Sequence, residues 1–430
     1  MARFRHVDVI EVGIWGSRVG AVAADPQLKA YVFEYDPQWA RSGIQLAPLT
    51  MPVAAGSGRS FTFPELDEPT FKGLPGLLSD ALPDKFGNQL IDAWMVRKGY
   101  RPAQITTLDR LAYMNRRAMG ALEFRPARGG QVASSVPLQM GRLVEQARLA
   151  FKGQLDAGDS AGQALNQLIS VGTSAGGARA KAVIGWNPDT GEMVAGQFDL
   201  PAGFEHWLLK FDGTGNDQEL GPSQQYGRIE YAYSRMATLA GVTMQPCRLH
   251  HEGGRAHFMT RRFDRDGNDK VHVQSLCALR HMSYNQVHTH AYESLFLAAR
   301  DLGLGDAEMT QLFARMAFNV AARNQDDHTR NFAFLMRRGL PWALAPAYDI
   351  TFAMDPGNRW LAAHQMSVNG RFQDIARDDL LAVAAQFSIP RVAPALEQIN
   401  SAIARWPEFG AEAGVSAQEV VRIGALHRRI

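Results

Sequence analysis

Residues Arg323–Phe334, with the sequence RNQDDHTRNFAF, change within twelve positions from strongly polar to apolar. Asn324, Asp326, Asp327, His328 and Asn331 fall within eight positions. The run Phe332–Phe334 that follows is typical of a buried strand. A chain with this segment must fold so that a polar loop leads directly into its core. The segment is therefore either a hydrated turn or a place where charge is held for chemistry.

The spacing of three polar residues indicates which chemistry this is. Asp326 and Asn331 stand in the order D-x-x-x-x-N, and Asp349 follows eighteen residues after Asn331. Protein kinases use this order for a catalytic Asp, an Asn five residues later and a metal-binding Asp after a short hairpin. One carboxylate accepts the proton of the attacking hydroxyl, while a carboxamide and a second carboxylate supply oxygen ligands for Mg²⁺. Taken alone, the spacing also fits a solvated turn rich in Asp and Asn.

A lysine and a glutamate upstream suit the same chemistry. Lys210 alternates with Trp207 and Leu209 in HWLLKFDG, which predicts a strand with the lysine directed inward toward phosphates. Glu230 lies twenty residues later on a predicted helix, where it would pair with Lys210. The alternatives are a lysine that snorkels at a strand end and a glutamate exposed at a helix start.

The segment VGTSAGGARAKAVI places Gly172, Gly176 and Gly177 ahead of Lys181 and a predicted strand. Glycines allow backbone N–H groups to approach phosphate oxygens closely. The segment is neither a Walker A sequence nor the G-x-G-x-x-G of ordinary kinases, so by itself it also fits a flexible turn.

Composition limits the class of protein. At 430 residues, with 46% hydrophobic and 20% charged residues, the chain is long enough for two or three packed units with a large core. A formal net charge of +2 gives no support to wholesale binding of a nucleic-acid backbone, although it is compatible with a local basic patch. The charge clusters in MTRRFDRD and MRRG fit solvated faces or a patch that faces operator DNA or the antitoxin.

Cysteine usage and the N-terminal sequence indicate the compartment. Cys247 and Cys277 are too few for a disulfide framework or a cysteine-rich zinc site. Asp8 and Glu11 interrupt the N-terminal stretch, which therefore does not resemble a signal peptide. No apolar run is long enough to span a bilayer. We expect a cytoplasmic protein with no membrane partner.

The order of strand and helix patterns predicts an α/β (α+β) protein. VDVIEVGIW and YVFEYD predict strands, and LSDALPDKFGNQLIDAWMVRKG predicts a helix that begins near Pro83 and stops at Gly99. AKAVIGWN and HWLLKFDG predict a strand pair with NPDTGE as the turn between them. From Ala291 onward the pattern is mostly helical, apart from FAFLM and WALAPAYDI. We place a small subdomain at residues 1–125 and the remaining core at 126–430.

Seven segments resemble, in order, the HipA family of bacterial serine/threonine kinases, the toxins of HipBA-type toxin–antitoxin modules. They run across nearly the whole chain: LLSDALPDKFGNQL, SAGGARAKAVI, LLKFDG, RRFDR, NQDDHTRNF, PAYDI and MSVNG. The resemblance implies a two-lobed protein-kinase-like fold behind the N-terminal subdomain. Its N-terminal lobe would span about residues 126–265, and its large helical C-terminal lobe about 266–430.

The resemblance also implies a role for each matching residue. Asp326 would be the catalytic base, Asn331 and Asp349 would hold Mg²⁺, and Glu230 would form an ion pair with Lys210. The residues expected around ATP are Gly176, Gly177, Ala178, Arg179, Ala180, Lys181, Lys210, Arg261, Arg262, Phe263, His328, Thr329, Arg330, Asn331, Tyr348 and Asp349. Arg261–Phe263 would offer backbone groups to adenine, and His328 and Tyr348 would line the nucleotide.

Partners follow from the same resemblance. It implies a helix-turn-helix antitoxin of the HipB type that holds the toxin on operator DNA. The substrate would be a protein hydroxyl, with an aminoacyl-tRNA synthetase as the precedent in the family. The segment LCALRHMSYNQVHTHAYESL, where a substrate loop is expected, does not show the family's acidic-glutamine pattern.

Ser174 aligns with the serine that HipA-type kinases phosphorylate on themselves. A phosphate adds about −1.5 to −2 charges near neutral pH and would be repelled by a bound triphosphate. We expect phosphorylated Ser174 to hold the Gly-rich loop out of the cleft and to switch the kinase off. The alternative is that Thr173 and Ser174 only cap a turn.

Two positions depart from familiar patterns. Gln325 precedes Asp326 where ordinary kinases have an arginine, so control by a phosphate on the activation loop is not expected. Arg261 stands where a familiar family member has an acid, which leaves only backbone contacts to adenine.

Other functions compete with an active kinase. The chain would otherwise be a catalytically silent family member that binds its antitoxin on DNA, although a silent kinase usually lacks one of Lys210, Asp326, Asn331 and Asp349. A metal hydrolase built on the Asp326–His328 cluster leaves Lys210 and the Gly-rich loop unexplained. His250, His251, His288 and His290 have spacings that also permit a structural zinc site.

Overall fold

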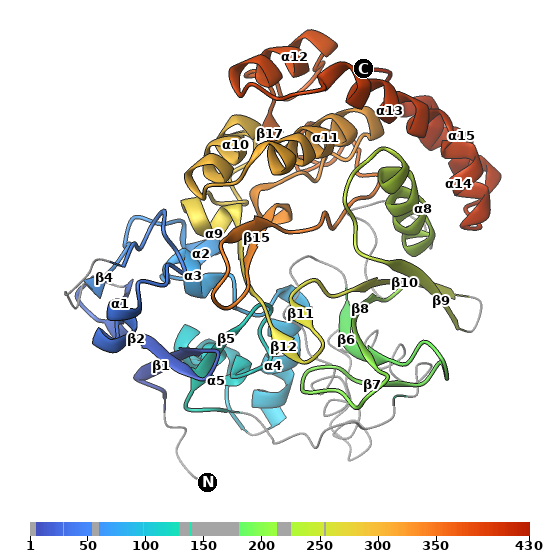
Figure 1. Ribbon diagram of the computed structural model, residues 1–430. Coiled ribbons are helices and arrows are strands. Elements are labelled where there is room, and N and C mark those ends of the chain that lie inside the picture. Colours follow the sequence, from blue (N-terminus) through green and yellow to red (C-terminus); the bar gives the residue numbers. More distant parts are fainter. Residues whose placement is uncertain are drawn as a thin grey trace. The chain divides into compact units, whose positions relative to one another are not determined.

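Figure 1 shows the computed structural model of the chain, which describes residues 6–28, 30–53, 60–97, 99–128, 138, 180–212, 225–252 and 255–430. Packing divides the chain into two compact units, each assembled from segments that are far apart in sequence. Unit 1 consists of Met1–Gly215, Arg261–Gln274 and Arg337–Gly339. Unit 2 consists of Asn216–Thr260, Ser275–Met336 and Leu340–Ile430. The domain boundaries expected at residues 125 and 265 stay predictions.

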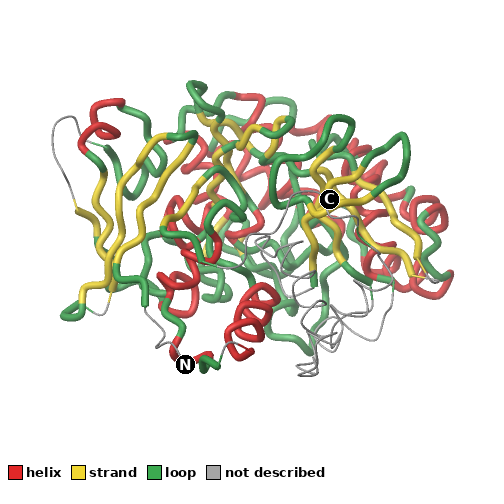
Figure 2. Tube along the Cα trace, turned by 90° about the horizontal axis from the view of Figure 1, so that it is seen from below, coloured by secondary structure: helices red, strands yellow, loops and turns green. Residues whose placement is uncertain are grey.

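A five-stranded antiparallel sheet forms the N-terminal part of unit 1 (Figure 1, Figure 2). Its strands, in sheet order, are β4 (Ser60–Phe61), β3 (Ala30–Tyr35), β2 (Ser17–Asp25), β1 (Val9–Ile14) and β5 (Leu122–Arg125). Ile10, Val12 and Ile14 of β1 are buried at every second position, because successive side chains of a strand point to opposite faces. The strands predicted from VDVIEVGIW and YVFEYD are confirmed as β1 and β3.

Short helices accompany this sheet in unit 1. They are α1 (Pro37–Ser42), α2 (Glu68–Phe71), α3 (Gly76–Ser79), α4 (Lys85–Arg97), the 3-10 helix η1 (Pro102–Gln104) and α5 (Thr107–Met114). The helix predicted to stop at Gly99 is confirmed as α4. Asp84 Oδ1 accepts a hydrogen bond from Gly87 N at 2.7 Å at its start, and Gly99 has a φ of +83° just after its end.

Three further strands of unit 1 pair in antiparallel fashion, with β6 between the other two. They are β7 (Met193–Ala195), β6 (Lys181–Trp186) and β8 (Glu205–Lys210). The predicted pairing of AKAVIGWN with HWLLKFDG is confirmed by β6 and β8. The predicted position of the turn is wrong, because residues 187–192 join β6 to β7, and Asn187 N donates to Glu192 O at 3.0 Å. The short apolar run Met193–Ala195, overlooked in the sequence, is itself a strand.

Unit 1 is completed by a short hairpin made from a later part of the chain. Its strands are β11 (Arg265–Asp266) and β12 (Asp269–Lys270), and β13 (His272–Ser275) follows.

Unit 2 is mostly helical, as predicted for the chain after Ala291. Its helices are α8 (Tyr226–Leu239), α9 (Leu276–Arg280), α10 (Tyr292–Asp301), α11 (Asp306–Ala322), the 3-10 helix η3 (Thr329–Asn331), α12 (Arg377–Gln386), α13 (Val392–Ala404), α14 (Trp406–Glu412) and α15 (Ala417–Leu426). Its strands are β9 (Cys247–Glu252), β10 (Arg255–Arg261), β14 (His290–Ala291), β15 (Ala333–Met336), β16 (Trp342–Leu344) and β17 (Met366–Ser367). The strands predicted at FAFLM and WALAPAYDI are confirmed as β15 and β16.

Helix α11 forms the centre of unit 2 (Figure 1). All but a few of its residues are buried, which is typical of a helix that passes through a core. The hydroxyl of Tyr233, on α8, donates to Ala322 O at 2.8 Å and so fixes the last turn. Arg323 then takes a φ of +57° and ends the helix. The polar segment that begins at Asn324 therefore starts from a rigid support.

Candidate functional site

The polar loop Asn324–Asn331 connects α11 to the buried strand β15. Gln325 N donates to Ala353 O at 2.9 Å, and Ala353 N donates to Arg323 O at 3.1 Å. The side chains of Asn324 and Gln325 are buried, and a hydrated turn would expose them. The loop is therefore part of the core and is held in place by backbone pairing.

Asn331 turns its side chain back onto this loop. Its Nδ2 donates to Asp326 O at 2.7 Å, and its backbone N donates to His328 O at 2.9 Å. His328 Nε2 lies 3.8 Å from Asp326 Oδ1. Because the amide nitrogen of Asn331 is committed to Asp326 O, its Oδ1 is the atom left to act as an acceptor or metal ligand.

The segment Tyr348–Asp349 is attached to the same loop at two points. The hydroxyl of Tyr348 donates to Arg330 O at 2.7 Å, and Asn324 Nδ2 approaches Asp349 O at 3.4 Å. Asp349 has a φ of +52°, a left-handed conformation that Asp and Asn tolerate better than other side chains. The structure thus attaches the side chain of Asn331 and the backbone of Asp349 to the loop that carries Asp326, all within unit 2. The predicted roles of the three residues stay predictions.

The remaining residues predicted near the nucleotide in unit 2 lie on the same loop. Thr329 Oγ1 donates to Met282 O at 2.7 Å, which fixes the 3-10 turn η3 from outside. The ring of His328 lies 5.4 Å from the ring of Tyr284, and the Arg330 guanidinium lies 5.5 Å from the same tyrosine ring.

Asp327 has no role in the kinase predicted from the sequence, yet its side chain contacts three distant residues. Its carboxylate accepts hydrogen bonds from Tyr292 OH at 2.7 Å, His364 Nδ1 at 2.8 Å and Gln365 N at 2.7 Å. Burial and the neighbouring Asp327 raise the pKa of Tyr292 well above its ordinary value, so the phenol remains a donor. Adjacent Asp326 and Asp327 in the sequence were a weak signal, because the partners are remote in the chain.

Several buried polar atoms around the loop have no hydrogen-bond partner among the described residues. They are Asn324 Oδ1, Gln325 Oε1, His328 Nδ1 and His364 Nε2. Buried polar atoms in proteins are almost always bonded to protein, ordered water or a ligand. This concentration at one loop indicates a place that binds water or a polar ligand.

In unit 1, Lys181 and Lys210 occupy directly opposed positions of β6 and β8. Opposed residues of an antiparallel pair point to the same face, with Cβ atoms about 4.5–5.5 Å apart. Both lysines are buried, at 4% and 8% exposure. Ala180 O, directly before β6, accepts a hydrogen bond from Phe211 N at 3.0 Å. Two ammonium groups on one face of the sheet suit an anionic ligand.

The predicted hinge, Arg261–Phe263, lies at the end of β10. Arg261 Nη1 contacts Glu205 Oε1 at 3.3 Å at the surface, and Arg262 N donates to His206 O at 2.9 Å. The N–H of Arg262 is therefore engaged within the protein.

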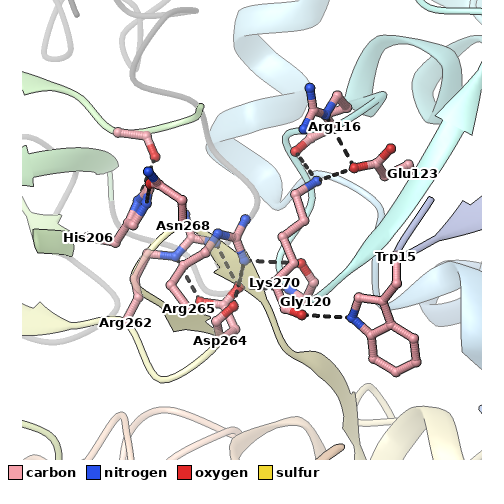
Figure 3. A network of polar contacts seen from close by, with 11 residues as sticks. Trp15, Arg116, Gly120, Glu123, His206, Arg262, Asp264, Arg265, Asn268 and Lys270 are labelled. Atoms are coloured by element: carbon pink, nitrogen blue, oxygen red, sulfur yellow. Dashed lines mark hydrogen bonds and ion pairs between the residues drawn. The ribbon is translucent and has the colours of Figure 1, made fainter. Parts of the chain in front are cut away.

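The guanidinium of Arg262 belongs to a buried polar network (Figure 3). It donates to both oxygens of Asp264, at 2.8 and 2.7 Å, and Arg265 Nη1 donates to Asp264 Oδ2 at 2.8 Å. Gly120 N also donates to Asp264 Oδ2, at 2.8 Å. Burial alone would raise the pKa of Asp264, but the guanidiniums of Arg262 and Arg265 outweigh burial and hold it well below its usual range.

The second half of this network joins β12 to the N-terminal sheet region. Lys270 Nζ donates to Arg116 O at 3.0 Å and to Glu123 Oε1 at 2.9 Å, and Lys270 O accepts from Trp15 Nε1 at 2.8 Å (Figure 3). Burial lowers the pKa of Lys270 to about 8, although Glu123 opposes this shift.

Some predicted site residues are not tested by this geometry. Ser174, Gly176, Gly177, Ala178 and Arg179 lie outside the described residues. Glu230 is buried in α8 of unit 2. Because Lys210 belongs to unit 1, the ion pair between the two stays a prediction.

Within the described ranges, no three His, Cys, Asp or Glu side chains cluster in a way that would hold a metal ion. His290 Nε2 instead donates to Ser283 O at 2.8 Å. No helix in the described part of the chain combines the length and apolar character needed to cross a bilayer.

Two regions of the chain match models of one protein family. The family model for the HipA-like C-terminal domain matches residues 173–406, and that for the HipA N-terminal domain matches residues 10–125. Among curated protein sequences, none matches the chain.

Solved structures were matched at two levels of similarity, and only the first, with a TM-score above 0.5, bears on the fold. HipA from Shewanella oneidensis MR-1, in the complex of a toxin–antitoxin system with HipB and its operator DNA, matches with a TM-score of 0.66 and 16% identity. The match covers 97% of this chain and 94% of that chain. The proinflammatory kinase CtkA of Helicobacter pylori matches with a TM-score of 0.32 and 12% identity, over 52% of this chain and 88% of that chain.

The fold is an α/β fold of the HipA type, which confirms the α/β (α+β) class predicted from the sequence. Because the C-terminal family model covers more than half of its residues, the chain belongs to the HipA family.

Proposed function

We propose that the chain is an ATP- and Mg²⁺-dependent serine/threonine protein kinase that acts as the toxin of a bacterial toxin–antitoxin system. The observation that carries the proposal is the arrangement of Asp326, Asn331 and Asp349. Asn331 is bonded to the backbone of Asp326, and Asn324 and Tyr348 hold the Asp349 segment on the same loop. A base and two oxygen ligands on one rigid frame are what phosphoryl transfer requires.

The oxygen atoms that the loop and the Asp349 segment offer fit Mg²⁺. The Asn331 Oδ1 and the Asp349 carboxylate are hard oxygen ligands, and Mg²⁺ usually binds through one or two such groups together with phosphates and water. When bound, Mg²⁺ would neutralise charge on the phosphates. Asp326 would orient the substrate hydroxyl and accept its proton as the oxygen attacks the γ-phosphorus. The bond between the γ-phosphorus and the β–γ bridging oxygen breaks in the same transfer, and ADP leaves.

Residues of unit 1 contribute the phosphate contacts in this proposal. The ammonium groups of Lys181 and Lys210 bind phosphate oxygens, together with backbone N–H groups of residues 176–180. His328, Thr329, Arg330 and Tyr348 line the nucleotide, and His328 Nδ1 is one of the buried atoms that a polar ligand would satisfy. Backbone groups of Arg261–Phe263 contact adenine.

The proposed partners rest on family membership. The matched HipA structure contains HipB and operator DNA, so we infer a HipB-like helix-turn-helix antitoxin that holds this chain on its operator. The substrate is a protein hydroxyl, with an aminoacyl-tRNA synthetase as the family precedent, and the reaction takes place in the cytoplasm. Autophosphorylation at Ser174 would switch the kinase off.

Two isosteric variants test the kinase. Asp326→Asn should lower phosphoryl transfer about 10²–10⁴-fold, since it removes a general base, while Mg·ATP binding is retained. Asp349→Asn should lower both transfer and Mg·ATP binding. Transfer is measured with radiolabelled ATP, using the chain itself and a basic protein such as histone as acceptors. Binding is measured by calorimetry.

Asp378→Asn is the matched control, because Asp378 is exposed on the first turn of α12. It should behave as the wild type in both assays. Equal transfer by the wild type, Asp326→Asn and Asp349→Asn would refute the kinase. A wild type that binds its antitoxin and DNA without any transfer would favour the catalytically silent family member.

A further inference from the structure

The carboxylate of Asp327 joins three separate parts of unit 2. Tyr292 comes from the first turn of α10, and His364 and Gln365 come from the segment between Asp349 and β17. Asp327, Tyr292 and His364 are 1%, 0% and 2% exposed. The donors are a phenol, an imidazole N–H and a backbone amide, so the carboxylate is satisfied without an arginine or lysine.

The network continues from Tyr292 to the backbone of Asp349, one of the two proposed metal ligands. Asn319 Nδ2 donates to Tyr292 OH at 3.0 Å, and Asn324 Nδ2 donates to Asn319 Oδ1 at 2.9 Å. The same Asn324 Nδ2 approaches Asp349 O at 3.4 Å. A continuous line of buried hydrogen bonds therefore runs from Gln365 through Asp327 to the backbone of Asp349. Such networks fix geometry strongly, because every broken bond leaves an unsatisfied buried group.

The location of this network matters for regulation. In protein kinases the segment after the metal-binding Asp is often ordered by phosphorylation, through pairs between arginine and the phosphate. Here Gln325 stands in place of that arginine before Asp326, and its Oε1 is buried without a partner among the described residues. From Ile350 to Met366, Thr351 is the sole residue with a hydroxyl side chain. The chain therefore has no arginine directly before Asp326, and the segment has a single hydroxyl group that could be phosphorylated.

We propose that Asp327 and His364 are positioning residues that hold the segment Ile350–Gln365 on the catalytic loop, so that the kinase is active without phosphorylation of this segment. The proposal rests on the proposed function. Compared with the arginine–phosphate pair of other kinases, the two partners are exchanged. Here the acidic group, Asp327, is on the catalytic loop, and the hydrogen-bond donor, His364, is on the segment that follows Asp349. The imidazole acts through Asp327 and does not take part in proton transfer to Asp326.

Two substitutions of similar polarity at His364 separate positioning from simple packing. Asn can place a donor where Nδ1 lies, whereas Gln extends its amide toward the position of Nε2. His364→Gln should lower kcat about 10²-fold, which is typical of a displaced catalytic group, with little change in the KM for ATP. His364→Asn should stay within a few-fold of the wild type. Loss of activity in both variants, or in neither, would overturn the proposal.

A second measurement does not depend on kinase activity. Hydrogen exchange of amides in Ile350–Gln365 should become faster in His364→Gln than in the wild type, and slow again in His364→Asn. If the wild type transfers no phosphate but exchange follows this pattern, the proposed function fails while the attachment of the segment stands. Unchanged exchange in His364→Gln contradicts the attachment itself.

Phosphorylation is tested directly. The substitution Thr351→Val should leave kcat within about twofold of the wild type. Treatment of the wild type with a phosphatase should not lower kcat, because removal of a phosphate from Ser174 would only relieve the proposed inhibition. Loss of activity in either case would show that the segment depends on a phosphate and would overturn the proposal.

Discussion

At the scale of single residues, the most unusual feature is the pair of buried lysines on β6 and β8. Like charges in directly opposed positions of a sheet destabilise it, and burial adds to the cost. Lys181 and Lys210 nevertheless occupy such positions. Each lysine also interacts with other groups of the protein, so the pairing by itself does not require a ligand. Both side chains lie on one face of the sheet, where the proposed kinase would bind phosphates, and we expect both to contribute to binding of the triphosphate.

Lys181→Met and Lys210→Met should each weaken binding of Mg·ATP about tenfold or more, because a hydrogen bond to a charged group contributes about 1.5–3 kcal/mol. Methionine retains the length of the side chain but not its charge. The measurement is the ATP-dependent rise in the melting temperature, confirmed by calorimetry. Lys85→Met is the control, since Lys85 is exposed at the start of α4. Wild-type affinity in both buried variants would contradict a phosphate role.

Residue-level prediction depends on local signals. The spacing of Asp326, Asn331 and Asp349 and the strand alternation around Lys210 led to the proposed site, and the roles of these residues stay predictions. Asp327 was missed as a structural centre because its side-chain partners lie 35 and 37 residues away in the sequence. Nothing near Tyr292 or His364 indicates that either residue meets the loop. Only packing brings them there.

At the scale of elements, the hairpin β11–β12 depends on charges rather than on apolar burial. Asp264 precedes β11 and is fully buried between Arg262 and Arg265 (Figure 3). Removal of one partner from a buried ion pair leaves uncompensated charge and is strongly destabilising. The strands of this hairpin are two residues long, too short for any alternation in the sequence to reveal them. Strand β7 is also short, with three residues, so the sequence pattern did not reveal it. The turn NPDTGE was for this reason expected to lead to β8, although it leads to β7.

Asp264→Asn should lower the free energy of unfolding by about 3–5 kcal/mol at neutral pH. The pKa of Asp264 is lower in the folded chain than in the unfolded chain, so its stabilisation is fully present above about pH 4. This stabilisation is lost as the pH falls toward the folded pKa. The difference between wild type and variant should therefore shrink in acid. Thermal unfolding followed between pH 7 and pH 3 measures both effects.

Asp266→Asn is the control on the same hairpin, because the Asp266 side chain is 69% exposed and its ion pair with Arg337 lies at the surface. A surface pair contributes about 0–1 kcal/mol, so this variant should resemble the wild type. Equal melting temperatures of the two variants would show that the buried network does not stabilise unit 1.

At the scale of the whole molecule, the charge is nearly balanced, with 45 Lys and Arg against 43 Asp and Glu. Affinity for a nucleic-acid backbone depends on the number of phosphates that a protein neutralises. A balanced chain offers little net attraction of this kind, so we expect the proposed attachment to operator DNA to come mainly from the antitoxin. The class of the fold was predictable from ordered motifs along the sequence, whereas the grouping of distant segments into two units was not.

The purified chain alone should bind a labelled fragment of its own upstream DNA no more tightly than about 10⁻⁶–10⁻⁴ M at physiological salt, the range of non-specific binding. Addition of the HipB-like partner should produce tight binding, and the chain should join that complex. Fluorescence anisotropy measures the first effect and analytical ultracentrifugation the second. Nanomolar binding by the chain alone would require a basic face that its net charge does not suggest.

The discontinuity of unit 1 has a consequence for how the protein is made. Gly120 is bonded to Asp264, which lies 144 residues later in the chain. A ribosome that adds about 5–20 residues per second exposes these partners roughly 7–30 s apart, and Asp326 and Asp349 emerge later still. A nascent chain therefore carries an unfinished N-terminal unit through much of its synthesis and has no complete catalytic loop until most of it has been translated. For an enzyme proposed to arrest growth, partial products should be harmless to the cell that makes them and good substrates for its proteases.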